Sequence, residues 1–199
     1  MLVRVGGVPG VGKTIVIERA VDLSPKSGVI IERARTKEVL CELAGVSTVE
    51  EYRTLPLNFR KSLYPEMDRR LYAEDQENPA TVRLYDGHFY FFDPETGGYQ
   101  TRTVYPEDKL QLMAIIVLAV ANPETLFRRR IQDQSFRLDR QQISLELLRK
   151  EQEMEVKTAA TQAEQLGIPF RVLQNEDGET DCVALQLLSF LGEYKWKIG

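Results

Sequence analysis

Hydrophobic and polar positions follow two different periods along the chain. Short apolar runs of strand-forming composition occur at residues 2–6, 29–31, 81–85 and 170–173. Between them, apolar positions recur at helical spacing at residues 15–23, 37–44, 56–77 and 180–191. This alternation of strands and helices predicts an α/β protein with a parallel sheet covered by helices on both faces.

The longest apolar run, residues 113–121, has the composition of a central strand. Its nine residues include several β-branched side chains and no polar one, as in a parallel strand buried on both faces. Asn122, Pro123 and Glu124 then predict the start of a helix, because they supply a capping side chain, a proline at the first helical position and an early acid. Residues 141–166 contain neither glycine nor proline and predict a long helix, which Gly167 ends.

Residues 88–105 interrupt the alternation. Aromatic residues and threonines flank a turn sequence at 93–98, which predicts a small β hairpin inserted after the strand at 81–85. We expect its aromatic side chains (Phe89, Tyr90, Phe91, Phe92 and Tyr99) to pack within the hairpin, with contact to a substrate as the alternative. The 199 residues are expected to form one domain, 1–199, with this hairpin as an insertion.

Composition and charge narrow the function classes. Hydrophobic residues make up 43% and charged residues 28% of the chain, as in a globular protein. The 26 basic and 30 acidic residues give a net charge of −4, which argues against nucleic acid or an anionic membrane as a partner. No apolar run is long enough to span a bilayer and the first residues do not resemble a signal peptide, so a cytoplasmic location is expected.

The two cysteines and the single histidine do not suit a metal cluster. Cys41 and Cys182 are distant in sequence and neighbour neither a histidine nor a second cysteine, so zinc-type spacing is missing. We expect both thiols to be reduced and to lie in the core. His88 is the only histidine of the chain.

A phosphate-binding loop is the strongest chemical signal. Residues 7–14, Gly-Val-Pro-Gly-Val-Gly-Lys-Thr, match the pattern G-x-x-x-x-G-K-[ST] between a predicted strand and a predicted helix. The glycines allow successive backbone N–H groups to point at phosphate oxygens, and the helix start adds its positive dipole. The predicted nucleotide-binding residues of the loop are therefore Gly7, Gly10, Val11, Gly12, Lys13 and Thr14. Lys13 should reach the β and γ phosphates of ATP, and Thr14 should offer its hydroxyl to Mg²⁺.

Two further groups of residues suit phosphoryl transfer. Asp86 follows the strand at 81–85 and is expected to face the loop at the carboxyl end of the sheet, where it would act with Thr14 on Mg²⁺ or orient the attacking oxygen. Five arginines in thirteen residues, Arg128, Arg129, Arg130, Arg137 and Arg140, could stabilise charge on a transferring phosphoryl group. A turn aspartate and a solvated, ion-paired helix are the simpler interpretations.

Taken together, these segments resemble the archaeal-type adenylate kinases, a branch of the P-loop nucleoside monophosphate kinases, over nearly the whole chain. The segments that match in order and spacing are residues 6–14, 51–56, 86–88, 98–99, 122–124, 129–133 and 152–154, with Asn175 and Gly178. The resemblance implies a three-layer P-loop NTPase fold with a five-stranded parallel sheet. It also implies transfer of the γ-phosphoryl group of ATP to AMP, with Mg²⁺ as cofactor and nucleotides as the small-molecule partners.

The resemblance also implies roles for particular residues. Residues 35–78 would form a helical acceptor-binding segment and residues 128–141 a lid that closes over the phosphates. Among the acceptor-binding candidates, the resemblance implies Arg53. Arg35, Thr36 and His88 are further candidates, with a packed or hydrogen-bonded histidine as the alternative for His88. Arg129 and Arg137 would be catalytic beside Lys13 and Asp86, and Arg129, Asn175 and Gly178 would contact the nucleotide. Members of the family often form trimers, so a homo-oligomer is a further expectation.

The sequence departs from the family pattern after the second strand, in the lid and after Gly98 and Tyr99, so other functions stay open. Arg33, Ala34, Arg35 and Thr36 replace the usual segment after the second strand, and Phe136 stands where a lid arginine is expected. One alternative is a P-loop kinase for a different small acceptor, and another is an ATP-binding or ATPase switch without kinase activity. A GTPase is not favoured, because the chain has no Asn-Lys-x-Asp motif. An AAA-type motor is not favoured either, because about 200 residues leave no room for a second subdomain.

Overall fold

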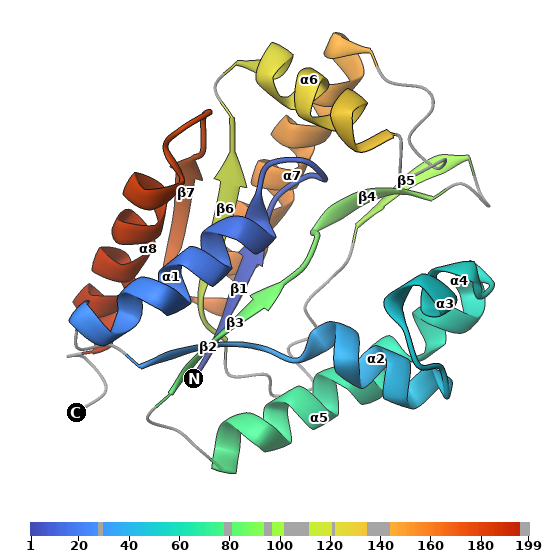
Figure 1. Ribbon diagram of the computed structural model, residues 1–199, viewed down its shortest axis with the longest axis horizontal. Coiled ribbons are helices and arrows are strands. Elements are labelled where there is room, and N and C mark those ends of the chain that lie inside the picture. The colour runs from blue at the N-terminus through green and yellow to red at the C-terminus, as the bar shows by residue number, and fades with distance from the viewer. Residues whose placement is uncertain are drawn as a thin grey trace.

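Five parallel strands form the central sheet (Figure 1). They are β1 (Leu2–Gly6), β2 (Ile31–Arg33), β3 (Val82–Asp86), β6 (Leu112–Ala119) and β7 (Phe170–Gln174), in the order β2-β3-β1-β6-β7. The structure is a computed structural model that describes residues 1–27, 30–77, 81–93, 97–101, 112–120, 122–134 and 144–195. The predicted α/β fold with a five-stranded parallel sheet is confirmed.

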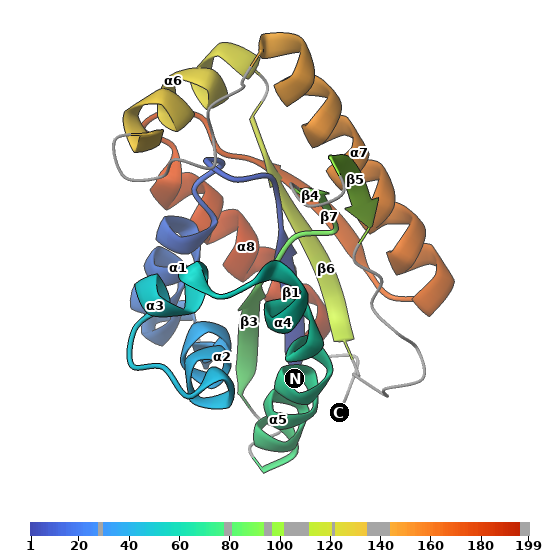
Figure 2. The same cartoon turned by 90° about the vertical axis from the view of Figure 1, so that its right-hand side faces the viewer.

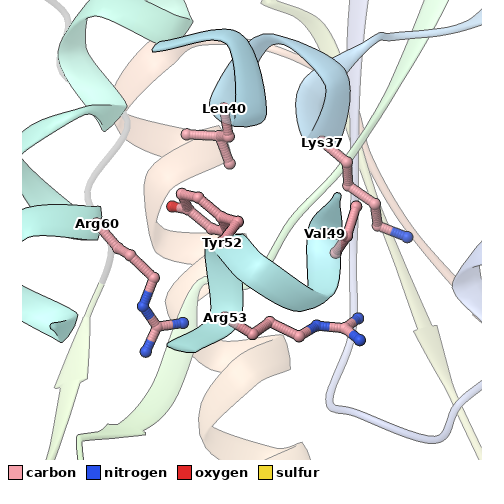
Figure 3. A pocket seen from close by; sticks show the side chains of 6 residues that line it. All are labelled: Lys37, Leu40, Val49, Tyr52, Arg53 and Arg60. Atoms are coloured by element: carbon pink, nitrogen blue, oxygen red, sulfur yellow. The ribbon is translucent and has the colours of Figure 1, made fainter. Parts of the chain in front are cut away.

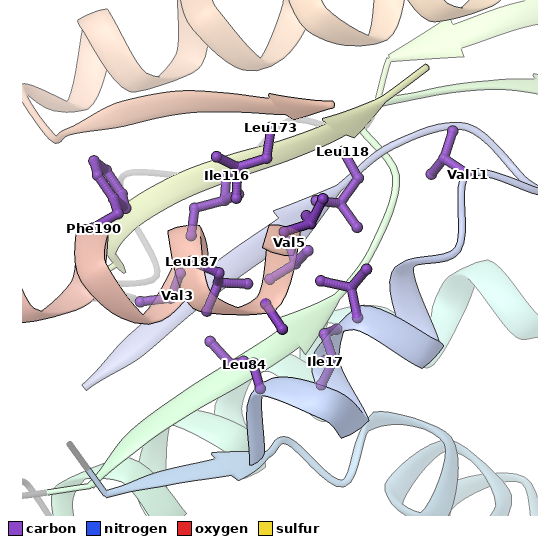
Figure 4. Close-up of a cluster of buried hydrophobic side chains, with 14 of the residues drawn as sticks. Val3, Val5, Val11, Ile17, Leu84, Ile116, Leu118, Leu173, Leu187 and Phe190 are labelled. Carbon is purple, nitrogen blue, oxygen red and sulfur yellow. The ribbon is translucent and has the colours of Figure 1, made fainter. Parts of the chain in front are cut away.

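Helices cover both faces of this sheet, since the side chains of β6 alternate between two separate cores. Ala114, Ile116 and Leu118 join the cluster that packs against α1 (Lys13–Ser27) and α8 (Thr180–Lys195), as Figure 4 shows in part. Ile115 and Val117 point to the other face, where α7 (Leu145–Leu166) covers them. Burial on both faces explains why this strand is apolar at every position.

Four short helices form a separate lobe between β2 and β3 (Figure 2). They are α2 (Thr36–Ala44), α3 (Val49–Thr54), α4 (Leu57–Ser62) and α5 (Tyr64–Glu77). The prediction of one helix over 56–77 was wrong, because the chain breaks at Leu63, directly before α5. Pro65 is the physical reason, since it lacks an N–H and its ring clashes with the carbonyl four residues earlier.

An antiparallel hairpin lies within residues 88–105, as predicted. It consists of β4 (Tyr90–Asp93) and β5 (Gly98–Thr101), and the rings of Tyr90 and Tyr99 stack with centroids 4.9 Å apart. Phe89, just before β4, is completely buried against α7. Among the described aromatic side chains, Phe89 packs in the core, and the half-buried Tyr90 and Tyr99 pack against each other within the hairpin.

The remaining elements agree with the sequence analysis except in detail. α6 (Pro123–Gln134) begins where Asn122 accepts the N–H of Glu124 at 2.9 Å, and Gly167 ends α7 in a left-handed conformation. β2 begins at Ile31 rather than at residue 29, which lies outside the described residues. The first residues of the helix predicted from 141 also lie outside them, and α7 begins after its capping residue Ser144.

The two cysteines differ in their surroundings. Cys41 is buried in α2, whereas Cys182 is exposed, so the core position predicted for the second thiol was wrong. Cys182 lies in the first turn of α8, where the side-chain amide of Gln186 donates to its sulfur at 3.5 Å. Among the described helices, none combines the length and the apolarity needed to cross a membrane.

A buried carboxylate ties the helical lobe to the sheet. Asp75, on α5 and only 4% exposed, contacts the amino group of Met1 and lies 3.4 Å from the guanidinium of Arg83 on β3. Arg83 itself is 6% exposed. One carboxylate therefore compensates two cationic groups at the start of the sheet.

Substituting Asp75→Ala should lower the free energy of unfolding by about 3 kcal/mol, because the Met1 amino group loses its carboxylate partner and the buried Arg83 keeps only the more exposed Glu32, at 3.5 Å. Urea unfolding followed by circular dichroism measures this change. Glu50→Ala is the matched control, since its pair with Arg53 is exposed and is worth at most about 1 kcal/mol. Equal losses in the two variants would contradict a structural role for Asp75.

Candidate functional site

The loop between β1 and α1 has the backbone that phosphate binding requires. Gly7, Gly10 and Gly12 have φ angles of 137°, 92° and 88°, which side chains other than glycine rarely adopt. α1 begins directly at Lys13, so the positive end of its dipole faces the loop. Both properties match the prediction of an anion-binding loop at residues 7–14.

Side chains from other elements hold the carbonyl groups of this loop. Arg130 on α6 donates to the carbonyl of Pro9, and Asn175 after β7 donates to that of Val11, each at 2.7 Å. Lys13 donates to the carbonyls of Gly7 at 2.6 Å and Val8 at 3.3 Å and is 7% exposed. The loop shape is therefore fixed by α6 and by the turn after β7 as well as by its own glycines.

Thr14 and Asp86 meet beside the loop, as the sequence predicted. The Thr14 hydroxyl donates to a carboxylate oxygen of Asp86 at 3.3 Å. One hydroxyl and one carboxylate fit Mg²⁺, which prefers few protein oxygens and takes phosphate and water for the rest. No cluster of three or more ligating side chains occurs in the described part of the chain. A metal at this position would thus depend on the nucleotide for most of its ligands.

The arginines of α6 have different partners. Arg128 and Arg129 both pair with Asp177 in the turn after β7, at 2.9 Å for Arg129. Arg130 pairs instead with Glu151 on α7 at 2.8 Å and is 5% exposed. Arg129 retains a buried Nη1 atom without a hydrogen-bond partner, so one donor of its guanidinium remains for a ligand. The predicted catalytic Arg137 and half of the predicted lid, residues 135–141, lie outside the described residues.

A small pocket of about 190 Å³ lies in the helical lobe (Figure 3). Six residues from α2, α3 and α4 line it: Lys37, Leu40, Val49, Tyr52, Arg53 and Arg60. Figure 3 shows the ring of Tyr52 between Leu40 and Arg60, and the guanidinium of Arg60 lies 5.9 Å from the ring centroid. The Nε atom of Arg60 is buried without a hydrogen-bond partner. Three cationic side chains line the pocket, with Arg60 beside the ring and the charged ends of Lys37 and Arg53 extending away from it in Figure 3. Their positive charge suits a small anionic ligand.

The other predicted site residues lie in varied places. Of the four predicted acceptor residues, only Arg53 lines this pocket; Arg35 pairs with Glu42 at 2.9 Å and Glu74 at 3.8 Å. Thr36 begins α2, where its hydroxyl donates to the Ala34 carbonyl. His88 is half-buried after Asp86, and Gly178 has a φ of 81° in the turn after β7.

A family model described as AAA domain matches residues 6–149, which include the loop, Asp86 and the arginines of α6. The chain belongs to this family. The matched residues contain the phosphate-binding loop and most of the P-loop domain.

Comparison with other proteins places the fold among the P-loop kinases. No curated protein matches the sequence. A shikimate kinase from Acinetobacter baumannii, in complex with shikimate, is 13% identical with a TM-score of 0.53, covering 96% of this chain and 93% of that one. A shikimate kinase from Bacteroides thetaiotaomicron is 15% identical with a TM-score of 0.51, covering 96% and 98%. At such identities the likeness shows the fold, so the AAA-domain protein is a P-loop NTPase with a kinase-like fold.

Sequence reasoning missed Lys37 and Arg60 in the pocket and Glu155 beneath the loop. The first two lie on separate helices, and only packing of α2 against α3 and α4 brings them together. Glu155 lies in a long helix with many acids, so its sequence gives no sign that it is completely buried. Helical spacing does place it one turn after Glu151, on the same face.

Gly12→Ala should weaken ATP binding at least about 10-fold, because a methyl group would lie 2.5 Å from the Asn175 amide at a φ that alanine avoids. Calorimetric titration with ATP measures the affinity. Gly45→Ala is the control: its φ of 69° is also left-handed, but nothing lies within 4 Å of the added carbon. That variant should lose about 1 kcal/mol of stability and bind ATP normally. Normal binding by the Gly12 variant would refute the proposed role of the loop.

Proposed function

We propose that this protein transfers the γ-phosphoryl group of ATP to a small anionic acceptor, with AMP as the first acceptor to test. The observation that carries the proposal is the juxtaposition of Lys13 and the Thr14–Asp86 pair at the loop of a kinase-like P-loop fold. The pocket of Lys37, Arg53 and Arg60, in a lobe beside the sheet, supplies a second place for an anion.

Each residue has a definite task in such a reaction. Lys13, which lies on the carbonyls of Gly7 and Val8, would turn to the β and γ phosphates when ATP binds. Thr14 and Asp86 would hold Mg²⁺, which neutralises part of the phosphate charge. Arg129 would direct its unpartnered Nη1 donor to the nucleotide.

Phosphoryl transfer from ATP to a monophosphate needs no reactant besides these two molecules. An oxygen of the acceptor forms a bond to the γ phosphorus, and the bond from that phosphorus to the β–γ bridging oxygen breaks. The bridging oxygen keeps the electron pair and leaves as part of ADP. With a monophosphate as acceptor the attacking oxygen is already anionic, so positive charge and alignment do most of the work.

The charge of the pocket in the helical lobe favours an anionic acceptor. Arginine recognises phosphate and carboxylate groups through paired donors, and Tyr52 offers a flat surface beside them. Because the pocket is small, it suits the anionic end of an acceptor better than a whole nucleotide. AMP is favoured by the sequence resemblance, and other phosphorylated or carboxylated metabolites are the alternative.

The decisive experiment is a coupled assay for ADP with MgATP and a panel of nucleoside monophosphates, shikimate and an acceptor-free control. ADP formation that requires one acceptor supports the proposal. Slow hydrolysis unchanged by every acceptor would overturn it and favour a nucleotide-binding switch. Lys13→Ala should abolish turnover without unfolding the protein, whereas the exposed Lys157→Ala on α7 should not alter it.

Arg60→Ala and Arg53→Ala should each raise the acceptor KM about 10-fold or more, because a charge-assisted hydrogen bond is worth about 1.5–3 kcal/mol. The KM for MgATP should change less than about 3-fold, since neither residue lies at the loop. Arg69→Ala serves as the control, because its partner is Glu66 on the exposed side of α5. If the acceptor KM is unchanged in both pocket variants, the acceptor binds elsewhere.

A further inference from the structure

Glu155 is a fully buried carboxylate beneath the phosphate loop. It lies on α7 and is 0% exposed. One oxygen accepts the N–H of Gly7 at 2.8 Å, and the two oxygens together accept those of Phe89, at 3.0 and 2.9 Å, and Tyr90, at 2.5 Å. Burial raises the pKa of Glu155, while these N–H donors and the charge of Lys13 oppose the increase. All of its contacts are to donors, which an ionised carboxylate matches.

The contacts of Glu155 lie directly after the ends of two neighbouring strands, β1 and β3. β1 and β3 pair as far as Val5 and Asp86, and the N–H of Gly87 still reaches the Val5 carbonyl at 3.1 Å. Beyond that point the segments that follow β1 and β3 diverge, the first into the phosphate loop and the second into the hairpin. Glu155 binds both chains within a few residues of their separation, at Gly7 and at Phe89.

A buried cation holds the same segment from another side. Arg4, on β1 and 2% exposed, donates to the carbonyl of His88, which belongs to the same peptide unit as the N–H of Phe89. Its guanidinium also lies 4.0 Å from the centre of the Phe89 ring. That ring approaches Gly6 so closely that an added Cβ would lie 2.5 Å from it. The peptide after His88 is therefore fixed by charges of opposite sign and by the packing of one ring.

The middle of the phosphate loop does not depend on Glu155. Arg130 holds the carbonyl of Pro9 and Asn175 holds that of Val11. Removing the carboxylate would therefore release the segments after β1 and β3 at Gly7 and Phe89, while Arg130 and Asn175 still hold the middle of the phosphate loop.

We propose that Glu155 is a positioning residue that holds the chain after Asp86 against the start of the phosphate loop, and so keeps Asp86 and Thr14 at metal-binding separation. The inference rests on the proposed use of these two residues for magnesium. Its role is to couple metal binding to nucleotide binding. Outer groups that orient metal ligands typically account for 10- to 100-fold in metal affinity or activity.

Glu155→Gln tests the role of Glu155 with little change of shape. It should weaken the hydrogen bonds, because the amide places an N–H donor where the carboxylate accepts N–H groups. The measured quantity is the ATP affinity with Mg²⁺ divided by that without it, from calorimetric titration. The ratio should fall about 10-fold, while the metal-free affinity changes less than about 3-fold. Glu153→Gln, an exposed acid on the same helix, should leave both values unchanged.

Two more variants separate positioning from folding. Asp86→Asn should lower the same ratio, and the double variant with Glu155→Gln should resemble Asp86→Asn alone if Glu155 acts through Asp86. Gly6→Ala displaces the Phe89 ring without changing any charge and should lower the ratio as well. If Glu155→Gln does not fold, the ratio measured for Gly6→Ala tests the proposal in its place.

The result that overturns the proposal is a wild-type ratio in Glu155→Gln, or in Gly6→Ala where the former cannot be purified. A fall of the metal-free affinity as large as that with metal would also overturn it, because it would indicate general support of the loop. The readout needs no turnover, so it stays valid if no acceptor is found and phosphotransfer is disproved.

Discussion

The constraint on which the site depends is the hydrogen-bonding balance of the loop after β1. A backbone that turns its N–H groups towards phosphate must satisfy its carbonyl groups elsewhere, because buried carbonyls without partners are costly. In this protein the donors come from three directions: Arg130 on α6, Asn175 after β7 and Lys13 within the loop itself. The carboxylate of Glu155 accepts the first N–H of the loop, that of Gly7, at 2.8 Å. The elements around the loop are thus arranged as much by its carbonyls as by hydrophobic packing.

The hairpin is the element that connects the helical lobe with the loop region. Gln100 on β5 accepts a hydrogen bond from Lys61 on α4 at 3.2 Å, and the hydroxyl of the neighbouring Tyr99 donates to Glu151 on α7 at 2.9 Å. Burial and this carboxylate together raise the pKa of Tyr99 above its usual range, so its proton stays in place at neutral pH. Glu151 also binds Arg130, which contacts the loop. A path of side-chain hydrogen bonds and one side-chain contact to the backbone therefore runs from the helical lobe to the phosphate site through the hairpin and α7.

What the sequence could predict was local, and what it missed depended on packing. The loop at 7–14 is a contiguous pattern whose neighbours in the chain are the strand and helix it needs, and Asp86 follows from the rule that parallel strands end at one edge. The break at Leu63 does not show in the apolar periodicity, which continues through it, although Pro65 causes it. The exposure of Cys182 does not follow from residue type, since free cysteines are usually buried. Lys37 and Arg60 meet only through the packing of short helices, which no local pattern specifies. The adenylate kinase type and the roles of Arg137, Asn175 and Gly178 stay predictions, as does oligomer formation.

Salt should affect the two attachments of α6 differently, because its ion pair with the turn after β7 is exposed and its ion pair with α7 is buried. On one side Arg128 and Asp177 form an ion pair whose side chains are 57% and 53% exposed, so dissolved ions screen it. On the other side the side chains of Arg130 and Glu151 are 7% and 13% exposed, so their ion pair is largely shielded from such screening. Raising the ionic strength therefore loosens the attachment of α6 to the turn after β7 and preserves its attachment to α7. The buried Arg130, which also donates to the carbonyl of Pro9, is therefore the attachment of α6 that is least sensitive to ionic strength.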